Sequence, residues 1–343
     1  MTLSDVPKVQ ANNEWSPLKS VIVGRAGHAC FPFAPAQAIS ATMPEKYQAF
    51  FKPQSPFPER VVSKAEAELN YLAVLLEGEG VQVLRPPQDI DWLAENGYTG
   101  AMVRDGLMTV GNTIIEAPFA WPSRSREIEI AYGSILRSLG TDPRVSIVRR
   151  SAETFNETLF DDMPEKGQWT INNSRPAFDT ADFMRFGSVI LGQYSHVTND
   201  AGVQYLRQHL PLGYRVEILE VNDPHAMHID ATLLPLREGL LVYNPQRVTE
   251  EALRKHEFLW TWKLVPFPFV PEDHQEPPLF MTSAWLSLNV LVLDGERVVV
   301  EASDDKTAAF YESLGMRCIR CPFRHVYSLG GSFHCATVDL VRT

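Results

Sequence analysis

The chain has 343 residues, of which 45% are apolar and 21% charged, a composition typical of a globular protein with one large core or two smaller ones. Its net charge of -11, from 42 acidic against 31 basic residues, argues against nucleic-acid and anionic-membrane partners. Residues 1–16 contain no apolar signal, and no run approaches the roughly 20 apolar residues of a membrane helix. We therefore expect a cytoplasmic protein.

In chain order, the sequence repeats one pattern about five times: an apolar strand, a tight turn, a second strand and a helical segment. Strand pairs are predicted from Gly106, Gly187, Ala231 and Ser287, and a fifth from Leu18 together with the C-terminal ATVDLVRT. Helices are expected at 59–79, 125–139, 200–210, 249–259 and 305–314. A repeat of roughly 50 to 90 residues predicts a cyclic or stacked α/β fold in one domain, residues 1–343.

The first chemical motif is Met-His-Ile-Asp, which precedes the strand ATLLPL. If it is extended, His228 and Asp230 point to the same face, because strand side chains alternate. They would form half of a metal site or half of an acid/base pair, although an H-x-D pattern at a strand end also arises by chance.

The second motif, FDTAD, places Asp179 and Asp182 among apolar residues. A buried carboxylate is costly unless it is paired, so a histidine or arginine partner is expected. Asp179 is the better functional candidate, since Asp182 could equally cap a turn.

Cys335 follows Gly330 and Gly331, whose backbone freedom permits close approaches and could hold a thiol exposed at a site. The alternative is a buried structural cysteine, the usual state of a free thiol. His334 is not expected to be its base, because neighbours in a strand face opposite sides.

The other cysteines carry no strong motif. Cys318 and Cys321 form a C-x-x-C pattern within a predicted strand, where residues three apart face opposite ways, so structural thiols are favoured over a zinc or redox site. The sequence has no G-x-G-x-x-G or G-x-x-x-x-G-K-S motif for a nucleotide. We expect neither a metal nor an organic cofactor.

Together the motifs resemble the arginine:glycine and arginine:inosamine-phosphate amidinotransferases of the guanidino-modifying pentein superfamily. The resemblance spans nearly the whole chain in the order of that family. Its segments are NEWSPLKSVIVG from Asn13, RDGLMTVGNTIIEAP from Arg104, FDTADFMRFG from Phe178, MHIDATLLPL from Met227, NPQR from Asn244, TSAWLSLNVLVLD from Thr282 and LGGSFHCATVD from Leu329.

The resemblance implies a five-bladed α/β propeller with pseudo-fivefold symmetry and one active site in its central channel, and a homodimer is the expectation for the family. The motifs that match give Cys335 as nucleophile, His228 as general acid/base and Asp179 as its orienting partner. They also give substrate-binding roles to a further set of residues: Asp105 and Asp230 for the guanidinium, Arg247 for the carboxylate of arginine, and Ser283 for a further substrate contact. The implied reaction moves the amidino group of L-arginine through amidino-Cys335 to an amine and releases L-ornithine.

The acceptor amine is less well defined. Met227 matches the glycine-type enzymes and favours an amino acid or small primary amine over an aminocyclitol phosphate. Those enzymes have Asn-Pro where this chain has Asp223-Pro224, and His225 follows with a larger, titratable side chain that would reshape the acceptor end of the pocket. Glycine, lysine and a natural-product amine all stay open.

Two alternatives use the same residues differently. An arginine deiminase-like hydrolase would replace the amine with water and release ammonia without any acceptor. In a non-catalytic arginine-binding protein, replacing Cys335 with alanine would leave its function unchanged.

Overall fold

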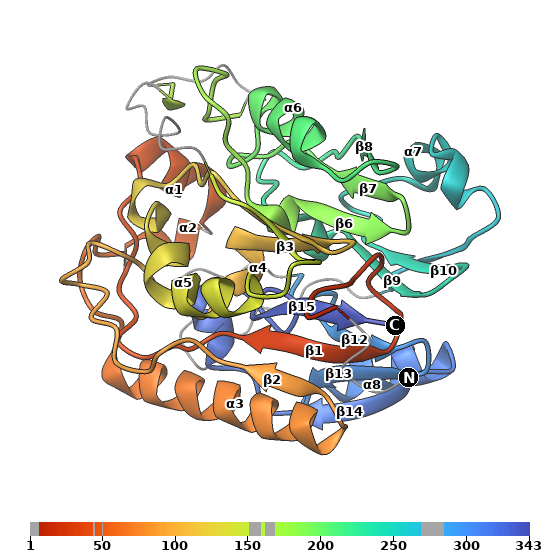
Figure 1. The fold of residues 1–343 in the computed structure, drawn as a ribbon, viewed down its shortest axis with the longest axis horizontal. Helices are drawn as coiled ribbons and strands as arrows, with labels where there is room; N and C mark the ends of the chain where they lie inside the picture. Colours follow the sequence, from red (N-terminus) through yellow and green to blue (C-terminus); the bar gives the residue numbers. More distant parts are fainter. Residues whose placement is uncertain (1–6, 44, 50, 151–158, 162–168, 269–284) are drawn as a thin grey trace.

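Five small sheets of identical connectivity make up the fold (Figure 1). The computed structural model describes residues 7–43, 45–49, 51–150, 159–161, 169–268 and 285–343. Each sheet has three strands: an antiparallel pair, followed by a third strand that runs parallel to the middle one. The parallel step requires a crossover, which a helix provides in each repeat.

Four sheets are continuous in sequence. They are β3 Leu107–Val110, β4 Thr113–Glu116 and β5 Ser146–Val148; β6 Phe183–Phe186, β7 Val189–Gly192 and β8 Arg215–Ile218; β9 Leu233–Arg237, β10 Leu240–Tyr243 and β11 Lys263–Pro266; and β12 Leu291–Asp294, β13 Arg297–Glu301 and β14 Arg317–Cys321. The fifth sheet joins the two ends of the chain, because β1 Leu18–Val23 pairs with β15 Thr337–Arg342 on one side and with β2 Gln82–Leu84 on the other.

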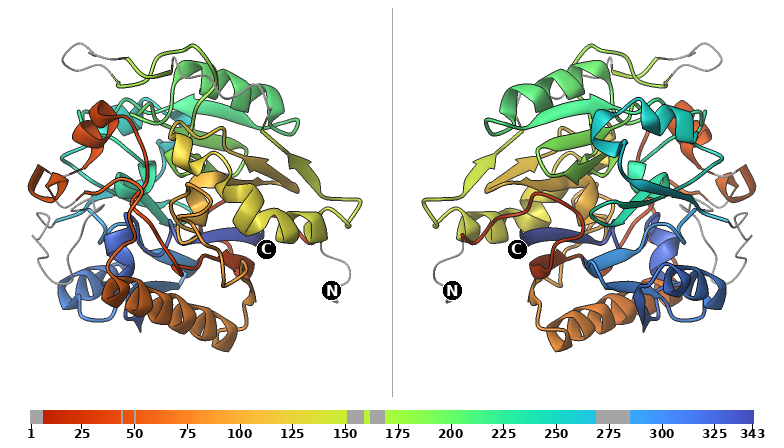
Figure 2. Two further views of the ribbon diagram at one scale, coloured as in Figure 1. Left: turned by 90° about the vertical axis from the view of Figure 1, so that its left-hand side faces the viewer. Right: turned by 90° about the vertical axis from the view of Figure 1, so that its right-hand side faces the viewer.

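The crossover helices lie outside the sheets (Figures 1 and 2). They are α3 Glu59–Gly78, α5 Glu127–Leu139, α6 Asp200–His209, α7 Glu250–Arg254 and α8 Asp305–Ser313. In α3, Leu69, Leu72 and Leu76 recur at helical spacing and are fully buried, so this stripe packs against the core. Three helices begin at a capping side chain that accepts the backbone N–H three residues on: Asn199, Thr249 and Asp304.

The five predicted repeats are confirmed as five sheets, but one strand pair was placed wrongly. The hairpin at Gly187 is β6 with β7, which flank this glycine, not two strands that both follow it. Arg185 interrupts the apolar pattern of β6, yet it is fully buried, because Glu14 and Asp339 neutralise it. The predicted 249–259 helix is divided, with α7 ending at Arg254 and a 3-10 turn at Glu257–Leu259.

Shorter elements complete the described chain. They are α1 Ala36–Thr42, α2 Glu45–Gln48, α4 Val103–Gly106, and 3-10 turns at Pro122–Arg124, Thr180–Asp182, Ile229–Ala231 and Val326–Leu329. Several of these turns lead directly into first strands, where the site described below is built. Among the described helices, none combines the length and apolarity needed to cross a membrane.

Candidate active site

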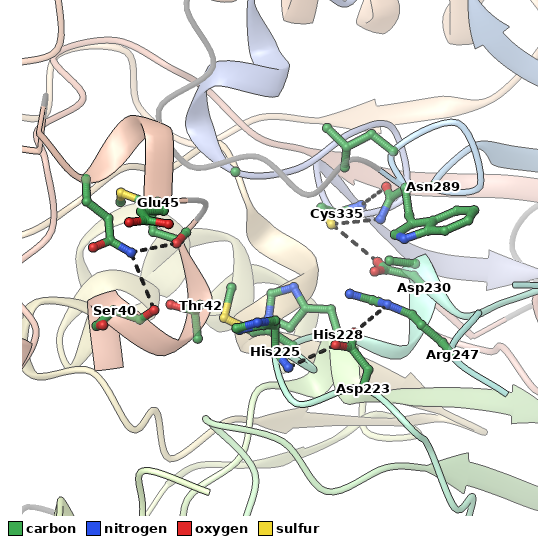
Figure 3. A pocket seen from close by; sticks show the side chains of 17 residues that line it. Ser40, Thr42, Glu45, Asp223, His225, His228, Asp230, Arg247, Asn289 and Cys335 are labelled. Carbon is green, nitrogen blue, oxygen red and sulfur yellow. Dashed lines mark hydrogen bonds and ion pairs between the residues drawn. The ribbon is translucent and has the colours of Figure 1, made fainter. Parts of the chain in front are cut away.

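A cavity of about 610 Å³ collects the candidate residues from distant parts of the chain (Figure 3). One wall comes from α1 and α2, and another from the loop that precedes β9. Cys335, Asn289 and Asp230 lie together in Figure 3, away from Ser40 and Glu45 of the first wall. The cavity is therefore polar at both ends, with the sulfur of Cys335 at one of them.

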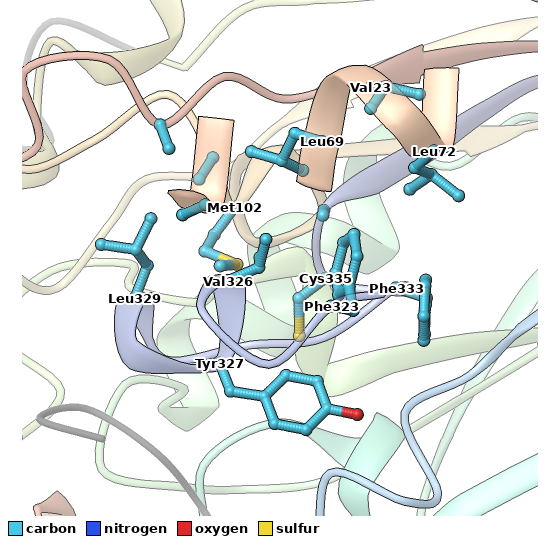
Figure 4. Packing of buried hydrophobic residues seen from close by; sticks show 14 of the residues in the cluster. Val23, Leu69, Leu72, Met102, Phe323, Val326, Tyr327, Leu329, Phe333 and Cys335 are labelled. Carbon is cyan, nitrogen blue, oxygen red and sulfur yellow. The ribbon is translucent and has the colours of Figure 1, made fainter. Parts of the chain in front are cut away.

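Cys335 lies in a turn just before β15 and is only 2% exposed. Its side chain packs in an apolar cluster that includes Met102, Phe323 and Phe333 (Figure 4). Gly331 is needed for this approach, since a Cβ atom there would lie 2.5 Å from Met102 Sδ and 2.6 Å from Cys335 Cβ. The thiol is thus held in a fixed position with one side open to the cavity.

His228 lies beside this sulfur in an uncommon backbone conformation, with φ at 69°. Its N–H donates to Asp182 Oδ1 at 2.9 Å, and the other oxygen of Asp182 accepts hydrogen bonds from Ser195 and Thr198. Asp182 therefore holds the turn that carries His228, a structural role like the turn cap considered for it in the sequence. Positive φ in a non-glycine residue is often found at functional sites, where the surrounding structure maintains it.

Asp179 contacts the ring of His228, with 3.0 Å between Oδ2 and Nε2. The other nitrogen, Nδ1, lies 3.7 Å from Asp105 Oδ1. A ring nitrogen of His228, an oxygen of Asp105 and Cys335 Sγ all lie within 4.8 Å of one another. Since Asp179 occupies Nε2, Nδ1 is the nitrogen available for proton exchange with the sulfur.

Electrostatics at these groups favour a protonated imidazole and a protonated thiol in the free protein. Burial would lower the pKa of His228, but the carboxylates of Asp105 and Asp179 raise it well above its usual value. Burial raises the pKa of the Cys335 thiol to about 12, and the charge of Asp230 adds to this effect, while the hydrogen bond with His228 opposes it. A cation brought close to Asp230 and Asp105 would offset part of that increase.

Two buried carboxylates offer oxygens that have no hydrogen-bond partner among the described residues: Asp105 Oδ1 and Asp230 Oδ1. The second oxygen of each is occupied, in Asp105 by Arg124 at 2.7 Å and in Asp230 by His334 at 2.9 Å. Buried polar atoms are normally paired, so two unpaired oxygens near one sulfur indicate a site for a hydrogen-bond donor.

Arg247 supplies a group of opposite charge in the same cavity. Its Nε lies 2.7 Å from Asp223 Oδ2, while Nη1 is buried and without a partner in the described part of the chain. Burial lowers the pKa of Arg247, although Asp223 opposes that effect. An anionic group entering the cavity would find an available donor here.

Two further predicted residues, Met227 and His225, line the outer part of the cavity. Met227 lines it and packs against the cluster that contains α1. His225 is exposed, and its Nδ1 lies 2.7 Å from the carbonyl oxygen of Ala41, which links the His225 loop to α1. Ser283 lies outside the described residues.

Two local predictions are wrong. The Met-His-Ile-Asp segment is not extended, because Ile229–Ala231 form a 3-10 turn after the positive φ of His228. His334 and Cys335 precede the strand instead of lying within it, so strand alternation does not separate them. Asp230 Oδ2 lies 2.9 Å from His334 Nδ1 and 3.3 Å from Cys335 Sγ.

Asn289 and Arg124 were missed in the sequence, and His334 was considered only as a base for Cys335. Asn289 Nδ2 lies 3.0 Å from Cys335 Sγ, and His334 holds Asp230. Arg124 bonds to Asp105 and Glu127 at 2.7 Å each. A polar Asn289 within the apolar run LSLNVLVL was the one available signal, since a buried amide needs partners.

For a metal ion, Asp105, His228 and Cys335 are the one group of ligand atoms brought together among the described residues. They would offer one oxygen, one nitrogen and one sulfur, whose side chains otherwise serve the interactions above. Cys318 and Cys321 lie in β14, which confirms the predicted strand, and neither joins such a group in the described part of the chain.

Comparison with known proteins relates the chain to one family, although no protein-family model matches it. The mitochondrial glycine amidinotransferase of Danio rerio is 38% identical over 363 residues, covering 97% of this chain and 83% of the relative. The L-arginine:L-lysine amidinotransferase of Pseudomonas savastanoi pv. phaseolicola is 38% identical over 360 residues, covering 99% and 96%. The chain belongs to the amidinotransferase family.

Solved amidinotransferase structures agree with this assignment. The amidinotransferase of the saxitoxin pathway from Microseira wollei is 32% identical, covers 98% of each chain and gives a TM-score of 0.85. The inosamine-phosphate amidinotransferase of Streptomyces griseus is 31% identical, with coverage of 98% and 97% and a TM-score of 0.84. A dimethylarginine dimethylaminohydrolase shares the fold alone, at 16% identity and a TM-score of 0.58.

Proposed function

We propose that this amidinotransferase takes the amidino group of L-arginine onto Cys335 and passes it to an amino acid or another small primary amine, releasing L-ornithine. The observation that carries the proposal is a pair of buried carboxylate oxygens near the Cys335 sulfur, Asp105 Oδ1 and Asp230 Oδ1, which accept no hydrogen bond from any described residue. A guanidinium is a planar cation with several N–H donors, and it stays protonated at physiological pH. Two carboxylates can therefore bind it and orient its carbon toward sulfur.

Arg247 supports the choice of arginine as donor substrate. Its Nη1, which has no hydrogen-bond partner among the described residues, could bind the carboxylate of the substrate. The cavity thus offers carboxylates for a guanidinium and a guanidinium for a carboxylate, the two charged groups of arginine. Ser283 stays a predicted substrate contact.

In the first half-reaction, the Cys335 proton passes to solvent or to an unprotonated His228, leaving a thiolate beside an imidazolium. The sulfur lone pair forms a bond to the guanidinium carbon, and the C=N π electrons move to nitrogen in a tetrahedral adduct. The imidazolium then protonates the substrate nitrogen that bears the ornithine chain. Breaking of that C–N bond expels neutral ornithine amine and leaves a cationic amidino-Cys335.

In the second half-reaction, the neutral acceptor amine bonds to the amidino carbon. His228, now unprotonated, removes a proton from the added nitrogen, and the C–S bond breaks to return the thiolate. Asp179 would stabilise the imidazolium and fix its ring throughout, as the third member of a triad does. No step requires an oxidant, a metal or an organic cofactor.

The acceptor has to occupy the space that ornithine leaves. Relatives at 38% identity are named for glycine and for lysine as acceptors, and a cavity of about 610 Å³ leaves room for either. Met227 and His225 lie on the wall nearest α1, where they would contact the part of the acceptor beyond its amine.

The test is to incubate the protein with arginine and a panel of amines, following ornithine and the intact mass. Ornithine that forms only with a particular amine, with an amidino adduct lost in Cys335→Ala, is expected. Citrulline and ammonia without any amine would identify the deiminase-like hydrolase instead. Unchanged turnover in Cys335→Ala would remove the proposed nucleophile.

We also infer that the five sheets close into a five-bladed propeller with pseudo-fivefold symmetry, forming a single domain over residues 1–343. The pairing of β1 with β15 supports this, since it joins the first and last strands of the chain. Homodimer formation and a cytoplasmic location stay predictions, to be tested by light scattering and by cell fractionation.

A further inference from the structure

The side chain of Asn289 touches the sulfur of Cys335 and is 1% exposed. Its Oδ1 accepts two backbone N–H groups, from His334 at 3.1 Å and from Cys335 at 3.2 Å. Rotating the amide by 180° would direct its NH2 group at the backbone N–H groups of His334 and Cys335. Those two N–H groups and the NH2 group itself would then all face donors and lack an acceptor. The orientation of the amide is therefore fixed by the backbone of the turn.

This fixed orientation directs Nδ2 at Cys335 Sγ, at a distance of 3.0 Å (Figure 3). We propose that Asn289 is a further catalytic residue, whose Nδ2–H group stabilises the Cys335 thiolate when the sulfur attacks and again when it leaves. The inference rests on the proposed function for its role in turnover, but the interaction with the sulfur can be measured without substrate.

The surroundings of the sulfur explain why such a donor is needed. Burial and the Asp230 carboxylate both oppose ionisation of the thiol, whose pKa rises to about 12. The contact between Sγ and Asp230 Oδ2, at 3.3 Å, is favourable only while the sulfur carries its proton. After ionisation that pair becomes repulsive, whereas the Asn289 hydrogen bond strengthens because its acceptor is charged.

Asn289 also differs from His228 in what happens during the reaction. His228 gives its proton to the leaving nitrogen and takes another from the acceptor, so its charge changes between steps. An amide keeps its donor in every step. It can therefore stabilise sulfur as nucleophile in the first half-reaction and as leaving group in the second.

The alternative is that Asn289 only holds the turn through Oδ1. The two roles belong to different atoms, so they can be separated by substitution. Asn289→Asp keeps an oxygen in place of Oδ1 and replaces the Nδ2 donor with a second oxygen. Asn289→Ala removes both atoms without adding a buried charge.

The experiment measures the rate of iodoacetamide alkylation at Cys335 from pH 6 to pH 10.5, by peptide mapping that separates it from Cys30, Cys318 and Cys321. Cys335→Ala gives the background. For Asn289→Ala, which adds no charge, we expect alkylation per folded protein slowed roughly 10- to 150-fold and a pH profile moved upward, since a hydrogen bond to a charged group is lost. Asn289→Asp, measured alongside, should be slowed further, because its second oxygen adds the repulsion of a carboxylate. kcat should fall by a similar factor.

Wild-type alkylation rates and pH profile in a folded Asn289→Asp protein would overturn the inference. Wild-type rates in Asn289→Ala, normalised to its folded fraction, would overturn it too. Slower alkylation in a protein whose wild type transfers no amidino group would refute the proposed function and leave the sulfur contact established. Transfer by the wild type with no Asn289 effect would refute only the present inference.

Discussion

Replacing Asp230 with asparagine should move amidino transfer and thiol reactivity in opposite directions. Asp230 is 2% exposed, and its free Oδ1 is proposed to bind the guanidinium. Removing one member of a buried charged pair costs about 2 to 5 kcal/mol. If that cost appears in the transition state, kcat/KM for arginine should fall roughly 30- to 5,000-fold.

The same substitution should make Cys335 easier to ionise. Asp230 is the second largest cause of the raised thiol pKa, after burial itself. Asparagine keeps an oxygen that can accept from His334 Nδ1, but it carries no charge. Alkylation of Cys335 at pH 8 should therefore become faster, by about tenfold for each unit by which the thiol pKa falls.

The assay compares ornithine release with iodoacetamide alkylation in the same preparation of Asp230→Asn. Asp294→Asn serves as the control, because Asp294 forms its ion pair with Arg297 away from the sulfur, and both rates should stay near those of the wild type. A parallel fall in both rates, at an unchanged melting temperature, would refute the electrostatic reasoning. It would mean that Asp230 acts mainly by shaping the turn around Cys335.

Three further predictions follow from the same geometry. Asp179→Asn should lower kcat about 10²- to 10⁴-fold in the ornithine assay, because it removes the charge that stabilises protonated His228. Arg247→Gln should abolish the preference for arginine over agmatine, which lacks the carboxylate, as measured by the ratio of their kcat/KM values. Since burial raises the thiol pKa to about 12, alkylation of free Cys335 should increase about tenfold per pH unit from pH 7 to pH 10 without a plateau.

The repeated fold was accessible from the sequence because its signals are local. Apolar strand pairs, glycine turns and amphipathic helices recur, and each repeat reads in the same way. Most of the third strands were not recognised. Ser146–Val148 and Gln82–Leu84 have only three residues each, too few for a periodic pattern, and their partners are defined by tertiary pairing. Arg185 in β6 misled the prediction for a related reason, since its buried partners lie at distant positions.

The same contrast between local signals and distant partners applies to the side chains of the site. Cys335, His228 and Asp179 were named because their motifs resemble those of a family, and the structure brings the three side chains together. Asn289 and Arg124 were not named, because their contacts with Cys335 and Asp105 join residues more than 15 positions apart, which no spacing rule connects. A single sequence does not reveal which buried polar atoms lack a hydrogen-bond partner in the folded chain.

The distribution of charge around the sulfur connects substrate choice with nucleophile control. Asp105 and Asp179 share the guanidinium of Arg124, which also binds Glu127 through a second nitrogen, and His228 is the other cation in contact with the two aspartates. Three carboxylates thus face two cations in a buried space, and Asp230, which pairs with His334, adds a fourth carboxylate 3.3 Å from Cys335 Sγ. This excess of negative charge attracts a guanidinium and raises the thiol pKa at the same time. Binding of arginine would neutralise it, so the sulfur becomes easier to ionise only when its substrate is in place.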